Sequence, residues 1–159
     1  MIKKNKKDFF VIAEVGQNHQ GELNLALEYV KIFAGLGADA VKFQIRNNKT
    51  LFSKEAYESK YNSENAFAKT YGKHREKLEL SFNDLTRVKK ECKKYKVKFM
   101  VTPFDEESLE KICKIGVDII KIASFDLGNL PLIHKIASKK KTTVISVGGG
   151  NIKQITSSI

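Results

Sequence analysis

The sequence of 159 residues predicts an α/β fold built on a parallel β-sheet. Short segments of β-branched and aromatic residues alternate with longer segments whose apolar residues recur at helical spacing. Strand–helix–strand units at this spacing are right-handed and place successive strands parallel to one another. The length is that of a single domain, so we expect residues 1–159 to form one unit.

The strands and helices are expected to follow one another along the chain. The expected strands cover residues 9–14, 40–45, 97–101, 118–123 and 143–147. The expected helices cover residues 23–36, a segment that opens at residues 81–84, a segment after residue 105, residues 130–138, and a last segment after residue 150. Residues 46–80 form an unusually long connection between the second strand and its helix, and long connections are often functional.

Helix boundaries carry their own sequence signals. Ser81 and Asp84 have the spacing of a capping box, and Asp105 is a typical N-cap residue. Gly116 is expected to end the helix that Asp105 opens. The helix after Ser81 has an apolar stripe that includes Cys92, so we interpret this cysteine as a core residue and not as a reactive thiolate.

A doubly wound sheet and a (β/α)8 barrel both accommodate this order of elements. Residues 37–42 and 116–121 share the pattern G-x-D-x-aliphatic-K and enter their strands at the same phase. Alternate side chains of a strand share a face, so polar residues near five successive strand ends can point inward: Glu14, Lys42, Gln44, Thr102, Lys121 and Ser146. A barrel explains this pattern better, because its active site lies at the carboxyl ends of its strands. We therefore predict the first five βα units of a TIM barrel, ending within the fifth helix.

The two lysines of this set, Lys42 and Lys121, are expected at one level of the barrel, since alternate strands share a layer. Two inward ammonium groups indicate a bound anion, because buried cations without partners are costly. The alternative is that each lysine pairs with an internal carboxylate, for which Glu14 is the obvious candidate. One carboxylate for two lysines would still leave a surplus positive charge.

The net charge of +11 does not by itself indicate a nucleic-acid partner. Only three of the 29 basic residues are Arg, and the lysines are dispersed along the chain. Nucleic-acid-binding proteins favour Arg because its guanidinium makes bidentate hydrogen bonds to bases and phosphates. No apolar segment approaches the ~18 residues of a membrane span. Two cysteines cannot support a disulfide framework, which favours the cytoplasm. We therefore expect small-molecule substrates and neither a nucleic acid nor a membrane as partner.

Four segments in order carry a resemblance to a known family. Residues 12–21 read IAEVGQNHQG, residues 37–44 read GADAVKFQ, residues 101–105 read VTPFD, and residues 120–124 read IKIAS. These resemble the "AEIG-NH-G", "GADAVKFQ", "STPFD" and "KIAS" motifs of the sialic acid synthase family. Members of that family are phosphoenolpyruvate-dependent synthases of nine-carbon sugar acids such as neuraminate, legionaminate and pseudaminate.

The resemblance implies a substrate site and a reaction. It implies that phosphoenolpyruvate is held by Lys42, Thr102, Lys121 and Ser124, with Ser146 as a further ligand. Glu14 and Gln44 would lie beside an N-acetylhexosamine such as N-acetylmannosamine, with Glu14 as the proton-transfer residue. C3 of phosphoenolpyruvate would attack the sugar aldehyde, polarised by a divalent metal (Mn²⁺ or Mg²⁺). Water would then add at C2, and phosphate would leave.

The sequence also departs from the family pattern. The fifth strand ends in Ser146-Val147-Gly148 where the family usually has "STG". These residues contain no counterpart of strands six to eight, which bring the metal-binding histidines in the family. They also contain no counterpart of the antifreeze-like domain, which covers the partner subunit's site in a homodimer. His19, His74 and His134 do not match the metal positions, so we expect no metal ligand in this chain. His19 is expected to order its loop and His134 to be structural. We expect an incomplete barrel without measurable synthase activity on its own.

Other interpretations remain open at this stage. The aromatic residues of the long connection, residues 46–80, could cover the sugar or only pack the connection onto the barrel rim. The chain could also be another barrel enzyme of anionic substrates, such as a Schiff-base aldolase that uses Lys42 or Lys121. A third possibility is a non-catalytic product, either an inactive fragment or a basic binding module.

Overall fold

The computed structural model describes residues 9–159, so the first eight residues of the expected domain lie outside this description. The described residues contain one parallel sheet of five strands, β1 (Ile12–Gly16), β2 (Ala40–Ile45), β3 (Lys98–Pro103), β4 (Ile119–Ile122) and β5 (Thr142–Ile145). Each strand pairs with the next along the chain, in the order β1-β2-β3-β4-β5. A doubly wound sheet would instead extend from both sides of its first strand. The consecutive order is that of a barrel and confirms the predicted five βα units.

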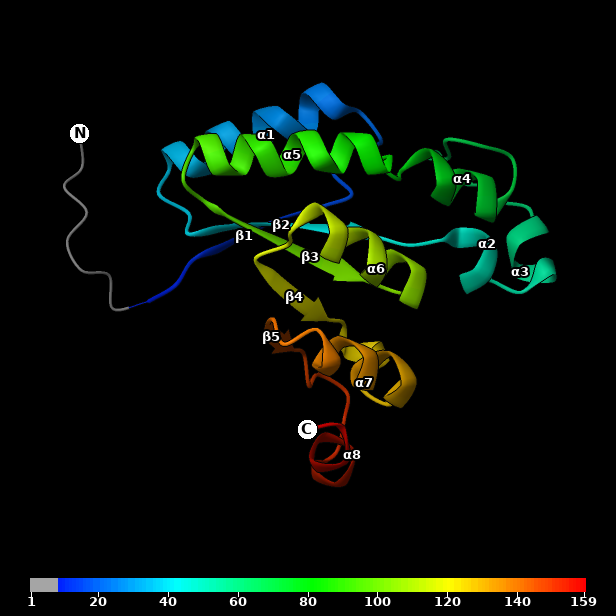
Figure 1. The fold of residues 1–159 in the computed structure, drawn as a ribbon. Helices are drawn as coiled ribbons and strands as arrows, with labels where there is room; N and C mark the ends of the chain where they lie inside the picture. The colour runs from blue at the N-terminus through cyan, green and yellow to red at the C-terminus, as the bar shows by residue number, and fades with distance from the viewer. Residues whose placement is uncertain (1–8) are drawn as a thin grey trace.

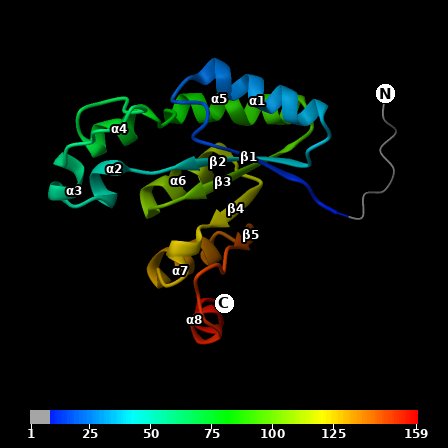
Figure 2. The ribbon, with the colours of Figure 1, turned by 180° about the vertical axis from the view of Figure 1, so that it is seen from behind.

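Helices cover one face of this sheet (Figures 1 and 2). The chain passes from β1 to α1 (Leu23–Gly35), from β3 to α6 (Glu106–Ile115) and from β4 to α7 (Leu130–Ser138). The fourth covering helix, α5 (Phe82–Lys94), comes after the long connection that follows β2, and α8 (Ile152–Ser158) follows β5. No described helix combines the length and the apolar character needed to cross a membrane.

The main hydrophobic core lies between the sheet and these helices. Its strand residues include Val41, Phe43, Phe99, Val101 and Ile120, and its helix residues include Ala26, Val30, Leu85, Val88, Cys92, Leu109, Ile112, Leu132 and Ile136. Cys92 is fully buried, and burial raises the pKa of its thiol to about 12, so the side chain is a protonated core residue as predicted.

The helix caps are as the sequence predicts. The Ser81 hydroxyl accepts a hydrogen bond from the Asp84 amide, and the Asp84 carboxylate accepts one from the Ser81 amide. The Asp105 carboxylate accepts from the Ser108 amide at 2.7 Å and so caps α6. Gly116 ends α6 with φ of +85°, a left-handed conformation that glycine adopts without steric cost.

Strand boundaries differ from the sequence prediction at the two edges of the sheet. The first strand begins at Ile12 instead of residue 9, because the Val11 amide donates to the Asp39 carboxylate at 2.8 Å instead of to a neighbouring strand. Phe9 and Phe10 are exposed before it. The fifth strand ends at Ile145 instead of residue 147. The third strand begins one residue and ends two residues later than predicted, and the fourth is one residue shorter at each end. β2 and α7 have the predicted bounds.

The long connection folds into short helices at the carboxyl end of β2 (Figure 1). These are α2 (Asn48–Leu51), α3 (Lys54–Glu58) and α4 (Tyr71–Lys77). Its aromatic rings pack against one another: the Phe52 and Tyr71 centroids lie 5.2 Å apart, and those of Tyr61 and His74 lie 4.3 Å apart. The connection therefore has an aromatic cluster of its own.

Candidate active site

Three inward-facing apolar residues form a floor inside the sheet. Ala40 of β2, Met100 of β3 and Ile119 of β4 are buried together, apart from the main core. Two residues further along each strand, on the same face, stand three polar residues: Lys42, Thr102 and Lys121. The sequence prediction that these side chains share one side of the sheet is therefore consistent with the strands as they are formed.

Glu14 and Lys42 face each other across the first two strands. They are direct partners in the register of β1 and β2, and their side chains form an ion pair. The Gln44 side-chain amide donates to Glu14 Oε1 at 3.3 Å, so a second residue of β2 also holds this carboxylate. The Lys42 side chain is only 14% exposed, and the ion pair compensates for its partial burial.

Lys121 has a different kind of partner. Its ammonium donates to Ser146 Oγ at 2.6 Å and to the backbone carbonyl of Ile122 at 3.1 Å. Among the described residues no carboxylate lies within ion-pair distance of it. Burial lowers the pKa of Lys121, the charge of Lys42 lowers it further, and Glu14 opposes both. The single carboxylate thus pairs with one lysine, and a positive charge is left over.

The strand register relates the two lysines to one layer. Lys42 is opposite Met100, and Met100 is opposite Ile119, so Lys121 stands two residues beyond the row of Lys42. In a (β/α)8 barrel of shear 8, each strand is staggered by about one residue relative to its neighbour. The stagger over the two strand-to-strand steps from β2 to β4 is therefore about two residues. This equals the offset between Lys42 and Lys121, as expected for two side chains at the same level of the barrel.

The remaining candidate residues line the same end of the sheet. Thr102 is buried and pairs in register with Gln44, and Ser146 directly follows β5. Ser124 opens a 3₁₀ turn, η1 (Ser124–Asp126), and is exposed to a hollow of 480 Å³ between this turn and residues 148–150. A Cβ atom on Gly148 would lie 4.0 Å from the Ser124 Cβ, so the two loops approach each other closely.

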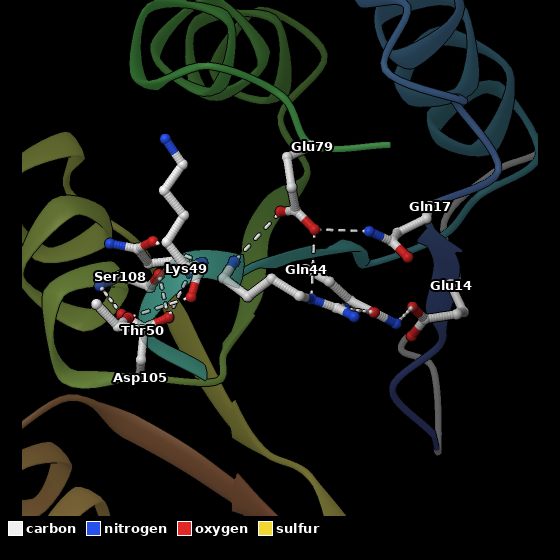
Figure 3. Close-up of polar contacts among 10 residues, drawn as sticks. Glu14, Gln17, Gln44, Lys49, Thr50, Glu79, Asp105 and Ser108 are labelled. Atoms are coloured by element: carbon white, nitrogen blue, oxygen red, sulfur yellow. Dashed lines mark hydrogen bonds and ion pairs between the residues drawn. The ribbon is translucent and has the colours of Figure 1, made fainter. Parts of the chain in front are cut away.

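A second polar network, which the sequence did not predict, continues from Gln44 (Figure 3). Arg46 Nη2 donates to Gln44 Oε1 at 2.5 Å, and the Arg46 guanidinium lies 4.2 Å above the Phe104 ring. Arg46 also pairs with Glu79, a carboxylate from the end of the long connection. Strand alternation could have identified Arg46, since it lies two residues after Gln44. No local pattern identifies Glu79, because it lies outside any strand.

Asp126 is a further residue that sequence reasoning missed. Its side chain is buried in η1, one carboxylate oxygen accepts from Asn129 Nδ2 at 3.2 Å, and the other has no hydrogen-bond partner. Burial raises the pKa of this carboxyl group, and the Asn129 contact opposes the rise. A single aspartate after a strand gave no sequence signal beyond that of an ordinary turn residue.

The three histidines are held in separate places. His19 is buried against Phe43, its Nδ1 accepts from the Gly21 amide at 3.1 Å, and burial lowers the pKa of its imidazole. This contact orders the loop after β1, as predicted. His74 Nδ1 accepts from the Phe67 amide, and His134 is exposed on α7. Within residues 9–159 no three His, Cys, Asp or Glu side chains are grouped so that they could hold a metal ion.

Comparisons with known proteins give relatives for most of the chain. The model of the NeuB family matches residues 29–159. The chain is 38% identical over 139 residues to N-acetylneuraminate-9-phosphate synthase of Drosophila melanogaster, covering 87% of this chain and 37% of that protein. It is 37% identical over 150 residues to N,N'-diacetyllegionaminic acid synthase of Campylobacter jejuni, covering 94% of this chain and 45% of that protein.

Solved structures lead to the same group of proteins. N-acetylneuraminic acid (sialic acid) synthetase of Leptospira borgpetersenii superposes with a TM-score of 0.79 at 30% identity, covering 94% of this chain and 48% of that chain. The present chain therefore spans less than half the length of each of these relatives.

Proposed function

The chain belongs to the NeuB family of sialic-acid-type synthases, and from this we propose that it binds phosphoenolpyruvate at Lys42 and Lys121 for condensation with an N-acetylhexosamine. The observation that carries the proposal is the surplus positive charge: the two ammonium groups influence each other inside the sheet, and the one carboxylate, Glu14, pairs with Lys42 alone. Phosphoenolpyruvate carries a phosphate and a carboxylate, which supply the missing negative charge.

The hydroxyl groups around the lysines complete the proposed phosphoenolpyruvate site. Thr102, Ser124 and Ser146 can each donate a hydrogen bond to an anionic oxygen, and Ser146 already contacts Lys121 at 2.6 Å. On binding, the phosphate or the carboxylate would replace Ser146 as a partner of the Lys121 ammonium. Charge-assisted contacts of this kind are strong because they form in a partly buried environment.

Glu14 and Gln44 occupy the side of the site where the sugar would bind. In the proposed reaction, C3 of phosphoenolpyruvate forms a bond to the aldehyde carbon, water adds at C2, and phosphate leaves with cleavage of its C–O bond. Glu14 can accept or return a proton during these steps, since its carboxylate lies beside Lys42 and is partly exposed. Lys42 and Lys121 would stabilise the negative charge of the substrate and of the departing phosphate.

The family resemblance also implies a divalent metal, but the described residues do not provide a site for one. His19 and His74 each accept a hydrogen bond from a backbone amide through Nδ1, and His134 is exposed on α7. We therefore assign the metal, the choice of sugar and a homodimeric assembly to the whole family-type protein, and no step above depends on them.

Calorimetry with phosphoenolpyruvate tests the proposal. Lys121→Ala should weaken binding by about 10- to 100-fold, because hydrogen bonds to charged groups contribute about 1.5–3 kcal/mol each. Lys139→Ala is the matched control, since Lys139 pairs with Glu110 on the helical side of the protein. Equal affinities of the wild type and Lys121→Ala would remove Lys121 from the site.

A further inference from the structure

Glu79 is a carboxylate that joins the long connection to two strand ends. It lies between α4 and α5, and its side chain is 14% exposed. Glu79 Oε1 accepts from Gln17 Nε2 at 2.7 Å, which ties it to the loop after β1. Glu79 Oε2 accepts from the backbone amide of Arg46 at 3.2 Å, directly after β2. Figure 3 shows Glu79 between Gln17 and the end of β2.

The contact between the Glu79 and Arg46 side chains is ionic. Arg46 Nε lies 3.3 Å from Glu79 Oε1 but makes no hydrogen bond, so the attraction depends on the charge of the carboxylate. The Arg46 side chain is only 7% exposed and has Phe104 on one side. Loss of the charge on Glu79 would therefore remove the ionic attraction that holds the Arg46 side chain in this position.

Arg46 in turn fixes which way the Gln44 amide faces. Because Arg46 Nη2 donates to Gln44 Oε1 at 2.5 Å, the Gln44 carbonyl oxygen is directed toward Arg46. The amide nitrogen is then left for Glu14, to which it donates at 3.3 Å. A reversed amide would place a carbonyl oxygen against the Glu14 carboxylate, and two acceptors repel each other.

Space around this pair of residues is limited. Gly16 has φ of +57°, and a Cβ atom there would lie 2.9 Å from Glu14 Oε1 and 3.3 Å from Gln44 Nε2. The backbone of β1 therefore passes directly beside the contact between Gln44 and Glu14. A glycine is required here, and little room is left for the two side chains to rearrange without losing their contact.

We propose that Glu79 is a positioning residue, which holds Arg46 so that Arg46 orients Gln44 and Gln44 orients the Glu14 carboxylate beside Lys42. Glu79 acts through Arg46 and has no contact of its own with the proposed substrates. This role rests on the proposed function, because the orientation of Glu14 matters for catalysis only if Glu14 transfers a proton there. The contacts themselves can be tested without substrate.

Three charged groups and one neutral polar group face Glu79. The charged groups are Arg46 after β2, Arg75 on α4 and Asp105 before α6, and the neutral group is Gln17 after β1. Lys49 and Lys111 line the adjacent hollow. Burial raises the pKa of Glu79 to about 8. The charge of Arg75 and the hydrogen bond from Gln17 oppose this rise, whereas the charge of Asp105 adds to it. The orientation of Gln44 should therefore change with pH as Glu79 ionises.

Nuclear magnetic resonance of the 159-residue chain tests the proposal directly. The probes are the side-chain amide signals of Gln44 and the carboxyl-carbon signal of Glu14. In Glu79→Gln both sets of signals should shift, since Glu14 loses a hydrogen-bond donor, and the pH dependence of the Gln44 signals near pH 8 should disappear. Arg46→Lys should give the same shifts, since one ammonium cannot reproduce the fork.

Ser53→Ala is the matched control for a general loosening of the long connection. The Ser53 hydroxyl caps α3 of the same connection by accepting from the Ala56 amide at 3.2 Å. The control should leave the Gln44 and Glu14 signals in place. Unchanged Gln44 and Glu14 signals in both Glu79→Gln and Arg46→Lys, or the same shifts in Ser53→Ala, would overturn the proposal. Should Glu79→Gln fail to fold, Arg46→Lys decides alone.

The catalytic consequence is measured in a full-length family-type protein that contains these residues, assayed with phosphoenolpyruvate and an N-acetylhexosamine. Glu79→Gln should lower kcat by about 100-fold, as misplacement of a reacting group by about 1 Å does, and should leave the affinity for phosphoenolpyruvate unchanged. Absence of synthase activity with intact Gln44 shifts would refute the proposed function and leave the positioning role standing.

Discussion

Glu79 should make the stability of this protein depend on pH in an unusual direction. Its pKa rises from an ordinary value of 4.5 to about 8 in the folded chain. Between these two values the folded state binds more protons than the unfolded state, so the free energy of unfolding falls as pH rises through this window. Glu79→Gln removes the titrating group, so the variant should lack this contribution.

The magnitude follows from the two pKa values. A difference of about 3.5 in pKa corresponds to about 5 kcal/mol, at about 1.4 kcal/mol for each pKa unit. The attraction of Arg46, 3.3 Å away, favours the charged carboxylate and reduces this figure. We therefore expect Glu79→Gln to match the wild type at pH 5 and to exceed its stability by about 2 kcal/mol at pH 9.

Urea unfolding of both proteins at pH 5, 7 and 9 measures this difference, and Glu91→Gln on α5 controls for the loss of a carboxylate. The difference between Glu79→Gln and the wild type should grow with pH, whereas the control should show no such growth. A Glu79→Gln variant that is less stable than the wild type at pH 9 would refute the reasoning. It would mean that the arginines outweigh burial and hold the pKa of Glu79 below its ordinary value.

Two further predictions concern the chemistry of the lysines and the activity of the chain. Borohydride in the presence of pyruvate should leave the mass of the protein unchanged, because the proposed reaction forms no imine; a trapped adduct on Lys121, whose pKa is lowered by burial, would favour a Schiff-base aldolase instead. In an assay with phosphoenolpyruvate, an N-acetylhexosamine and Mn²⁺, phosphate release by the 159-residue chain should stay at background. In this chain β1 and β5 each have a neighbouring strand on one side only, so water can enter the site and weaken the electric fields of Lys42 and Lys121. Sugar-dependent turnover by this chain would contradict that expectation.

The inward-facing residues of the strands could be predicted from sequence because their direction is a local property. Alternation fixes the face of Lys42, Gln44 and Thr102 once a strand is recognised, and β2 has the predicted bounds. The pairing of Lys121 with Ser146, 25 residues later, required only that both strands be placed in the same sheet. These parts of the site follow from the fold class.

The strand ends at the sheet edges could not be predicted, since they depend on tertiary partners. Residues 9–11 have strand-like composition, yet the Val11 amide donates to the Asp39 side chain, a tertiary contact between residues 28 positions apart. Glu79 is a second case, because its contact with Arg46 joins residues 33 positions apart through a connection without a regular period. Local sequence patterns do not predict contacts between residues so far apart in the chain.

These two kinds of residue have different roles in the proposed site. The lysines of the strands supply charge, and charge acts over several ångströms, so their placement by strand alternation is accurate enough for anion binding. Proton transfer by Glu14 requires a heavy-atom distance of about 2.6–3.2 Å to the reacting group, which alternation alone does not guarantee. In the proposed site the additional precision would come from Gln44, Arg46 and Glu79, which link the Glu14 carboxylate to the end of the long connection. The inward-facing lysines can therefore be predicted here from strand patterns, whereas the residues that hold the proposed proton-transfer group emerge only from the folded structure.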